Sequence, residues 1–247
     1  MLKKYFKQIF IMIFLIFSVV LTAEDNFMAV GNIKIVRPEP LLIKREDLNI
    51  TIEKDDTIKV ESMYTFSNLG EYNIKSTFMF WLDQTRENDN NNPNNSNKNN
   101  KGKYIKNIQF YSDYKKSKNL RAVIKFDENI YENQTVGNIQ REWFAISKTI
   151  PSKEEGRLGV YYDLQNTGFS KTKKFVYSFD LVSNFSEKNK VEILYINVYN
   201  KSGRKIDSIV YKDYEFKNLT GKKSQKEHYE LLVADVNLDE KLVINFK

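Results

Sequence analysis

The 247-residue sequence contains no cysteine and one histidine, and its formal net charge is +7 at pH 7. The absence of cysteine excludes disulfide bonds, thiolate metal ligands and thiol nucleophiles, and one histidine is too few for the common histidine-rich zinc sites. The positive charge is dispersed and forms no basic stripe with interleaved aromatic residues, so nucleic acid is not an expected partner.

The first 23 residues have the features of a secretory signal peptide. Lys3, Lys4 and Lys7 precede the apolar run "IFIMIFLIFSVVL" (9–21), and the small residues "TA" follow it. This run is shorter than the roughly 20 residues that a membrane-spanning helix needs. We therefore expect residues 1–23 to be a signal peptide that directs the protein to the periplasm, the cell envelope or the exterior. An uncleaved N-terminal anchor is the alternative, and it would be the one contact with a membrane.

Alternating apolar and polar residues predict β-strands along the rest of the chain. The pattern is regular in "LNITI" (48–52) and "IKVESMYTF" (58–66). In "IKSTFMFWL" (74–82) the second face is apolar as well, through Met79 and Trp81, which predicts a central strand covered on both sides. Further strands are predicted at 104–112, 120–126, 141–150, 157–164, 174–182, 191–199, 205–211, 228–236 and 241–246. So many short strands separated by turn residues predict an all-β protein with an immunoglobulin-like β-sandwich architecture.

Two β-domains are expected after the signal segment. The first is residues 24–165, and it includes the asparagine-rich loop 86–103 ("RENDNNNPNNSNKNNKGK"), whose composition favours turns over regular pairing. The second, smaller domain is residues 166–247. The turn-rich segment "LQNTGFSKTKK" (164–174) suggests the boundary between them.

Trp81 and Trp143 are the candidate binding residues. Aromatic residues make up 14% of the chain, and exposed aromatic rings form platforms for sugar rings. This makes a carbohydrate-binding module one hypothesis. The alternative is that both tryptophans belong to the core, since each stands in an apolar run, "FMFWL" and "REWFAI".

No complete catalytic set, cofactor motif or metal motif is recognisable in the sequence. His228 is the one candidate base for a serine or threonine nucleophile, and no nucleophile-elbow pattern accompanies it. The acidic pairs Glu46–Asp47, Asp55–Asp56 and Glu154–Glu155 leave a carboxylate-dependent hydrolase open by residue type. Neighbours in a strand point to opposite faces, however, and "DD" before Thr57 is a turn signal, so these acids are better explained as parts of strands and of a hairpin.

The region from residue 41 to 168 resembles a family of secreted bacterial proteins known only as a domain of unknown function. "REDLNI" matches its E-D-L-x-I strand through Glu46 and Asp47, and "VESMYTFSN" matches its V-x-Y-x-F-x-N pattern through Tyr64 and Asn68. Further positions fit at Trp143, Pro151, Tyr162 and Gly168. The resemblance implies an exported all-β protein and implies no reaction.

The expected function is therefore a non-catalytic one in the cell envelope, without cofactor or metal. The expected partner is an envelope protein or the cell-wall glycan, met by strand edges and loops. The alternatives are the carbohydrate-binding module and, less favoured, the carboxylate-dependent hydrolase.

Overall fold

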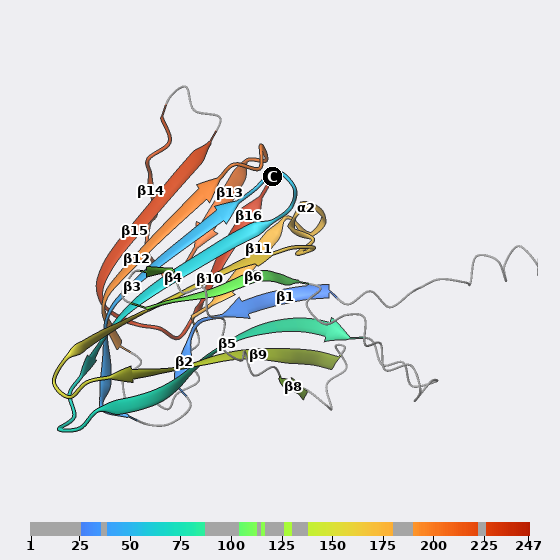
Figure 1. Ribbon diagram of the computed structural model, residues 1–247. Coiled ribbons are helices and arrows are strands. Elements are labelled where there is room, and N and C mark those ends of the chain that lie inside the picture. Colours follow the sequence, from blue (N-terminus) through green and yellow to red (C-terminus); the bar gives the residue numbers. More distant parts are fainter. Residues whose placement is uncertain are drawn as a thin grey trace, which may run out of the picture.

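The computed structural model describes residues 26–35, 39–86, 104–112, 115–116, 126–129, 138–179, 190–221 and 226–247 (Figure 1). The predicted signal peptide, residues 1–23, lies outside these residues. So does the predicted asparagine-rich loop, except for Arg86, which ends a strand. No helix within the described ranges is both long enough and apolar enough to cross a membrane.

The described strands form two eight-stranded sheets. Sheet A has the order β13-β16-β11-β1-β5-β9-β8, with β2 also pairing with β5. Its strands are β1 (Asn26–Gly31), β2 (Lys34–Ile35), β5 (Ile74–Arg86), β8 (Phe126–Asn129), β9 (Asn138–Ile150), β11 (Lys174–Ser178), β13 (Ile206–Val210) and β16 (Lys241–Phe246).

Sheet B has the order β14-β15-β12-β3-β4-β10-β6-β7. Its strands are β3 (Leu41–Ile52), β4 (Ile58–Asn68), β6 (Ile105–Ser112), β7 (Lys115–Lys116), β10 (Glu155–Leu164), β12 (Lys190–Asn200), β14 (Lys217–Asn218) and β15 (Glu227–Asn237). A short helix, α2 (Phe169–Thr172), connects β10 of sheet B to β11 of sheet A.

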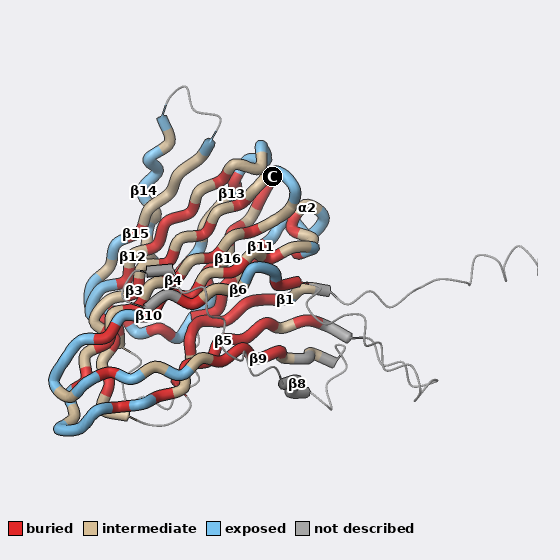
Figure 2. Tube along the Cα trace, in the orientation of Figure 1, coloured by how far each residue is buried: buried red, intermediate tan, exposed pale blue. Residues whose placement is uncertain are grey.

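The core lies between the two sheets. Phe66 of β4 packs on Phe78 of β5, with ring centroids 4.9 Å apart, and Phe80 of β5 stacks on Tyr162 of β10 at 5.0 Å. Along β4, buried residues alternate with partly exposed ones over the whole strand (Figure 2). Alternation puts every second side chain of each sheet into one shared apolar layer, so the molecule is a β-sandwich.

The predicted strand pattern is confirmed wherever the structure describes it. Leu48, Ile50 and Ile52 and the even-numbered residues of 58–66 face the core, and Asp55 and Asp56 lie in the turn that joins β3 to β4. Strand β5 is central, between β1 and β9, and its second face is also covered, because Met79 and Trp81 belong to a separate apolar cluster on the outside of sheet A. The segment predicted at 120–126 lies outside the described residues except for Phe126.

The expected division at residues 165 and 166 does not separate two sheets or two cores in the described part of the chain. Strand β11 pairs in parallel with β1, and β12 pairs in parallel with β3, so the C-terminal strands complete the same two sheets. One apolar cluster includes residues from both sides of the expected boundary, such as Phe66 and Phe246. The physical reason is that 166–247 supplies three strands to each of the two sheets, which the first segment leaves unfinished.

Both sheets are mixed, since each contains one parallel pair. Immunoglobulin-like sandwiches are built from two antiparallel sheets. The sandwich architecture is therefore established, and the immunoglobulin-like type is not confirmed by this topology.

Candidate functional site

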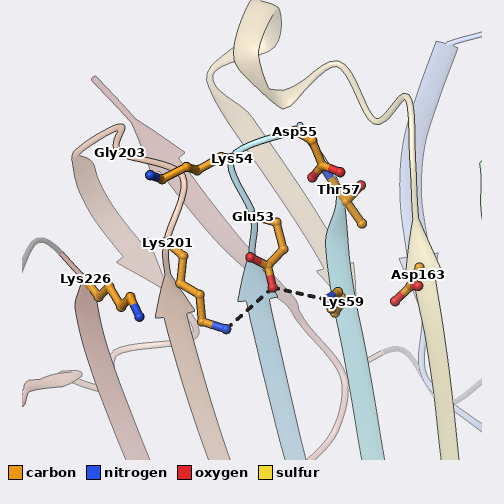
Figure 3. A pocket seen from close by; sticks show the side chains of 9 residues that line it. All are labelled: Glu53, Lys54, Asp55, Thr57, Lys59, Asp163, Lys201, Gly203 and Lys226. Carbon is orange, nitrogen blue, oxygen red and sulfur yellow. Dashed lines mark hydrogen bonds and ion pairs between the residues drawn. The ribbon is translucent and has the colours of Figure 1, made fainter.

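A charged pocket of about 650 Å³ lies at one end of sheet B. We call it the rim pocket (Figure 3). The turn between β3 and β4, the loop after β12 and the start of β15 bring its side chains together from distant parts of the sequence. It is lined by four lysines, three carboxylates and two other residues: Lys54, Lys59, Lys201, Lys226, Glu53, Asp55, Asp163, Thr57 and Gly203.

The carboxylates of the rim pocket are already engaged within the protein. Glu53 Oε1 lies 3.3 Å from Lys59 Nζ and 3.5 Å from Lys201 Nζ. Asp163 accepts hydrogen bonds from Tyr161 and Asn107, at 2.7 Å each. The Thr57 N–H donates to Asp55, and this hydrogen bond lowers the pKa of the Asp55 carboxyl. Lysines outnumber carboxylates at this rim, so the pocket is suited to the carboxylate or phosphate of a ligand.

The outer face of sheet B begins next to the rim pocket, as the cross-strand pairs show. Thr51 pairs with Lys59 on one side and with Tyr199 on the other, and Tyr199 pairs with His228. The rings of Tyr199 and His228 stack with centroids 4.4 Å apart. His228 Nε2 lies 2.9 Å from Asn197 Oδ1. The one histidine is thus held by an aromatic ring and an amide, which is a structural arrangement and not a nucleophile–base pair.

Farther from the rim, the same face carries exposed apolar side chains among charged ones such as Arg45 and Asp47. Tyr195 pairs with Leu232, and its hydroxyl donates to Glu230 at 2.7 Å. Leu232 is 63% exposed and Ile193 is 36% exposed, although both stand in the middle of long strands. Ile193 pairs with Ala234 and Leu232 pairs with Tyr195, so the two exposed side chains are diagonal neighbours on this face. Contiguous exposed apolar side chains, unlike single ones, are a feature of interaction surfaces.

Glu46 lies in the core, fully buried, between the two sheets. Asn32 Nδ2 donates to its Oε2 at 2.9 Å, and Ser62 Oγ lies 3.2 Å from its Oε1. The hydroxyl of Tyr64 donates to Asn32 Oδ1, and the hydroxyl of Tyr177 lies 3.3 Å from the same oxygen. We call Asn32, Glu46, Ser62, Tyr64 and Tyr177 the core polar cluster.

The core polar cluster contains no cation, and this environment changes the pKa of the Glu46 carboxyl. Burial raises its pKa to about 7, against the opposing effect of hydrogen bonds from Asn32, Ser62 and Tyr64. Burial likewise raises the pKa of the Tyr64 and Tyr177 hydroxyls well above their ordinary range. Asp47, the neighbour of Glu46, points to the outer face and accepts from Arg45 Nε at 2.9 Å. As expected for strand neighbours, the two acids do not share a site.

Trp81 and Trp143, the candidate sugar platforms, are both 3% exposed. They are cross-strand partners on the outer face of sheet A, and the guanidinium of Arg141 lies 3.7 Å from the centre of the Trp81 ring. Asp83 holds that guanidinium by two hydrogen bonds of 2.8 and 3.0 Å. The Trp81 ring also lies close against Gly31. Neither indole is free to stack on a sugar ring in this arrangement, so the carbohydrate hypothesis loses its two candidates.

Among the described residues, no group of three or more histidine or carboxylate side chains is arranged to hold a metal ion. Neither the rim pocket nor the exposure of Leu232 was predicted from the sequence. The lysines of the pocket come from three separate segments, and Leu232 stands in the same apolar run as the buried Leu231, so neither could be singled out from the pattern.

Comparisons with known proteins show the fold alone. No protein-family model and no curated sequence matches this chain. Its structure is similar to that of a proposed nutrient binding protein from Legionella pneumophila, with a TM-score of 0.61 and 10% sequence identity, over 90% of this chain and 72% of that chain. A proposed protease from Parabacteroides distasonis (TM-score 0.44, 5% identity) and an M1 zinc metallopeptidase from Deinococcus radiodurans (TM-score 0.43, 10% identity) are matched over 84% and 83% of this chain. This chain spans only 40% and 42% of those two proteins, and their low TM-scores carry no argument about function.

Proposed function

We propose that this protein is a non-catalytic binding protein of the cell envelope, which uses the outer face of sheet B to hold an acidic segment of another envelope protein. The observation that carries the proposal is the combination on one face of exposed apolar side chains, Leu232 and Ile193, with a lysine-rich pocket at its end. Apolar contact supplies affinity, and lysines favour a negatively charged partner.

A flat sheet face suits this role better than the strand edges do. The terminal strands of sheet B, β14 and β7, are two residues long in the described chain. Very short edge strands are a common protection against pairing with another chain. We therefore place the contact on the face of β12 and β15. Export rests on the predicted signal peptide 1–23, and the proposed nutrient binding role of the Legionella protein is compatible with a binding function.

Site-specific photo-cross-linking tests this proposal. A photoreactive phenylalanine analogue is placed at Leu232, and in a matched control at Tyr72, which is 57% exposed in the turn between β4 and β5. In cells, we expect one discrete protein adduct from position 232 and none from position 72. Equal adducts at both positions, or no adduct at 232, would contradict the proposal.

Charge reversal tests the acidic nature of the partner. Lys54→Glu with Lys201→Glu reverses two charges of the rim pocket, and Lys171→Glu on α2 is the control. The adduct at 232 should weaken in the double variant and stay unchanged in the control. If the adduct is a glycan, or if it is insensitive to the double reversal, the partner is not an acidic protein segment.

A further inference from the structure

The outer face of sheet A, on the opposite side of the sandwich from the rim pocket, holds a second cavity of about 430 Å³. Ligand pockets typically measure about 300 to 1,000 Å³. The cavity crosses β9, β5, β1, β11 and β16, and Thr172 of α2 also borders it. It is thus built on rigid strands rather than on loops.

The middle of the cavity has an apolar floor. Val176 of β11 and Val243 of β16 are direct cross-strand partners, and β1 brings Ala29 beside them. Ala29 belongs to the apolar cluster of Trp81, and Val176 packs against that cluster. These side chains offer no hydrogen bond, so the floor favours an apolar ligand body.

Two lysines stand at the ends of this floor. Lys241 lies opposite Ser178, and Lys174 lies opposite Asn245. Lys174 precedes Ser178 by four residues, which corresponds to about 14 Å along the strand. Both lysines are exposed. The one carboxylate among the described lining residues, Asp83, is bound to Arg141.

We propose that this cavity binds a free carboxylic acid with an apolar body, such as a medium-chain fatty acid. The apolar part lies on Ala29, Val176 and Val243, and the carboxylate meets the ammonium group of Lys174 or Lys241. Charge complementarity decides the class of ligand. An apolar floor between two cations, with its one lining carboxylate bound to Arg141, disfavours a cationic ligand, and a neutral ligand gains no charge-assisted contact.

Intrinsic fluorescence provides a direct assay, since the sequence has two tryptophans and Trp81 lines the cavity. The Trp143→Phe variant makes Trp81 the single reporter. Titrating decanoate below its micelle concentration should produce a saturable change in that signal, with the same dissociation constant by calorimetry on the unmodified chain. Decanol should bind at least about tenfold more weakly, as expected for the loss of one charge-assisted contact.

Substitution of Lys174 and Lys241 provides a second test of this proposal. Lys174→Met with Lys241→Met should weaken decanoate at least about tenfold and leave decanol unchanged. Lys75→Met, an exposed lysine on β5 that does not line the cavity, is the control and should change neither. Equal binding of decanoate and decanol, no effect of the lysine pair, or no saturable signal by either method would each overturn the proposal. None of these results bears on cross-linking at Leu232, so the two proposals fail separately.

Discussion

Replacing Glu46 by glutamine is expected to make the protein more stable above neutral pH. The carboxyl of Glu46 is fully buried, no described cation contributes to its titration, and its pKa is raised from 4.5 to about 7. In the unfolded chain it titrates near 4.5. Between these values the folded state holds a proton that the unfolded state has lost, so folding stability falls as pH rises. Glutamine has the same shape and no proton to lose.

The size of the effect follows from the pKa difference. One pKa unit corresponds to about 1.4 kcal/mol, so a shift from 4.5 to about 7 costs the unmodified protein about 3 kcal/mol once the pH is above 7. Below pH 4.5 the cost is absent. The Glu46→Gln amide can accept from Asn32 Nδ2 and donate to Ser62 Oγ, but one of its N–H groups lacks a partner. That cost is independent of pH and cancels when two pH values are compared.

The assay is urea unfolding of both proteins at pH values from 4 to 8, with the slope of the unfolding curve checked for constancy. The stability of the Glu46→Gln variant relative to the unmodified protein should rise by about 3 kcal/mol across this range. Asp47→Asn, on the exposed side of the same strand, is the control and should show no such rise. Parallel pH dependences for Glu46→Gln and the unmodified protein would refute a buried carboxyl with a raised pKa.

Four further substitutions test packing and hydrogen bonding by urea unfolding. Gly31→Ala would put a methyl group 1.8 Å from Trp81 Cε2 and should destabilise by about 1 to 3 kcal/mol or more, so an unchanged stability would contradict the close approach of the indole. Tyr211→Phe removes a buried hydroxyl that has no hydrogen-bond partner and should be neutral within about 0.5 kcal/mol or stabilising, whereas Tyr64→Phe breaks the core polar cluster and should cost about 1 to 3 kcal/mol. Equal losses of stability in Tyr211→Phe and Tyr64→Phe would contradict the different hydrogen bonding of the two hydroxyls. Asn68→Ala should cost about 2 to 3 kcal/mol, because the buried amide bonds carbonyl groups next to two turns, and a loss below about 0.5 kcal/mol would count against those bonds.

The strands could be predicted from the sequence because alternation is a local property, whereas the pairing of strands is not. The alternating run 191–199 predicts β12 correctly, but nothing within it specifies a parallel pairing with β3. That pairing joins residues about 150 positions apart and depends on which apolar faces remain uncovered after the nearer hairpins form. The two-domain expectation assigned each segment its own sheets, whereas β11 pairs with β1 and β12 pairs with β3 across the expected boundary.

The burial of Glu46 likewise could not be predicted from the sequence of its own strand. In "LLIKREDLNITI" the inward residues have odd numbers at Leu41 and Ile43 and even numbers from Leu48 on, so the strand must contain one irregularity between them. The structure places a bulge between Ile43 and Arg45. Had the bulge followed Asp47 instead, Glu46 would face solvent, because a shift of one residue exchanges the two faces of a strand. The sequence requires the irregularity, but only the pairing with β4, where Ser62 and Tyr64 supply hydroxyls for a buried carboxyl, selects its place.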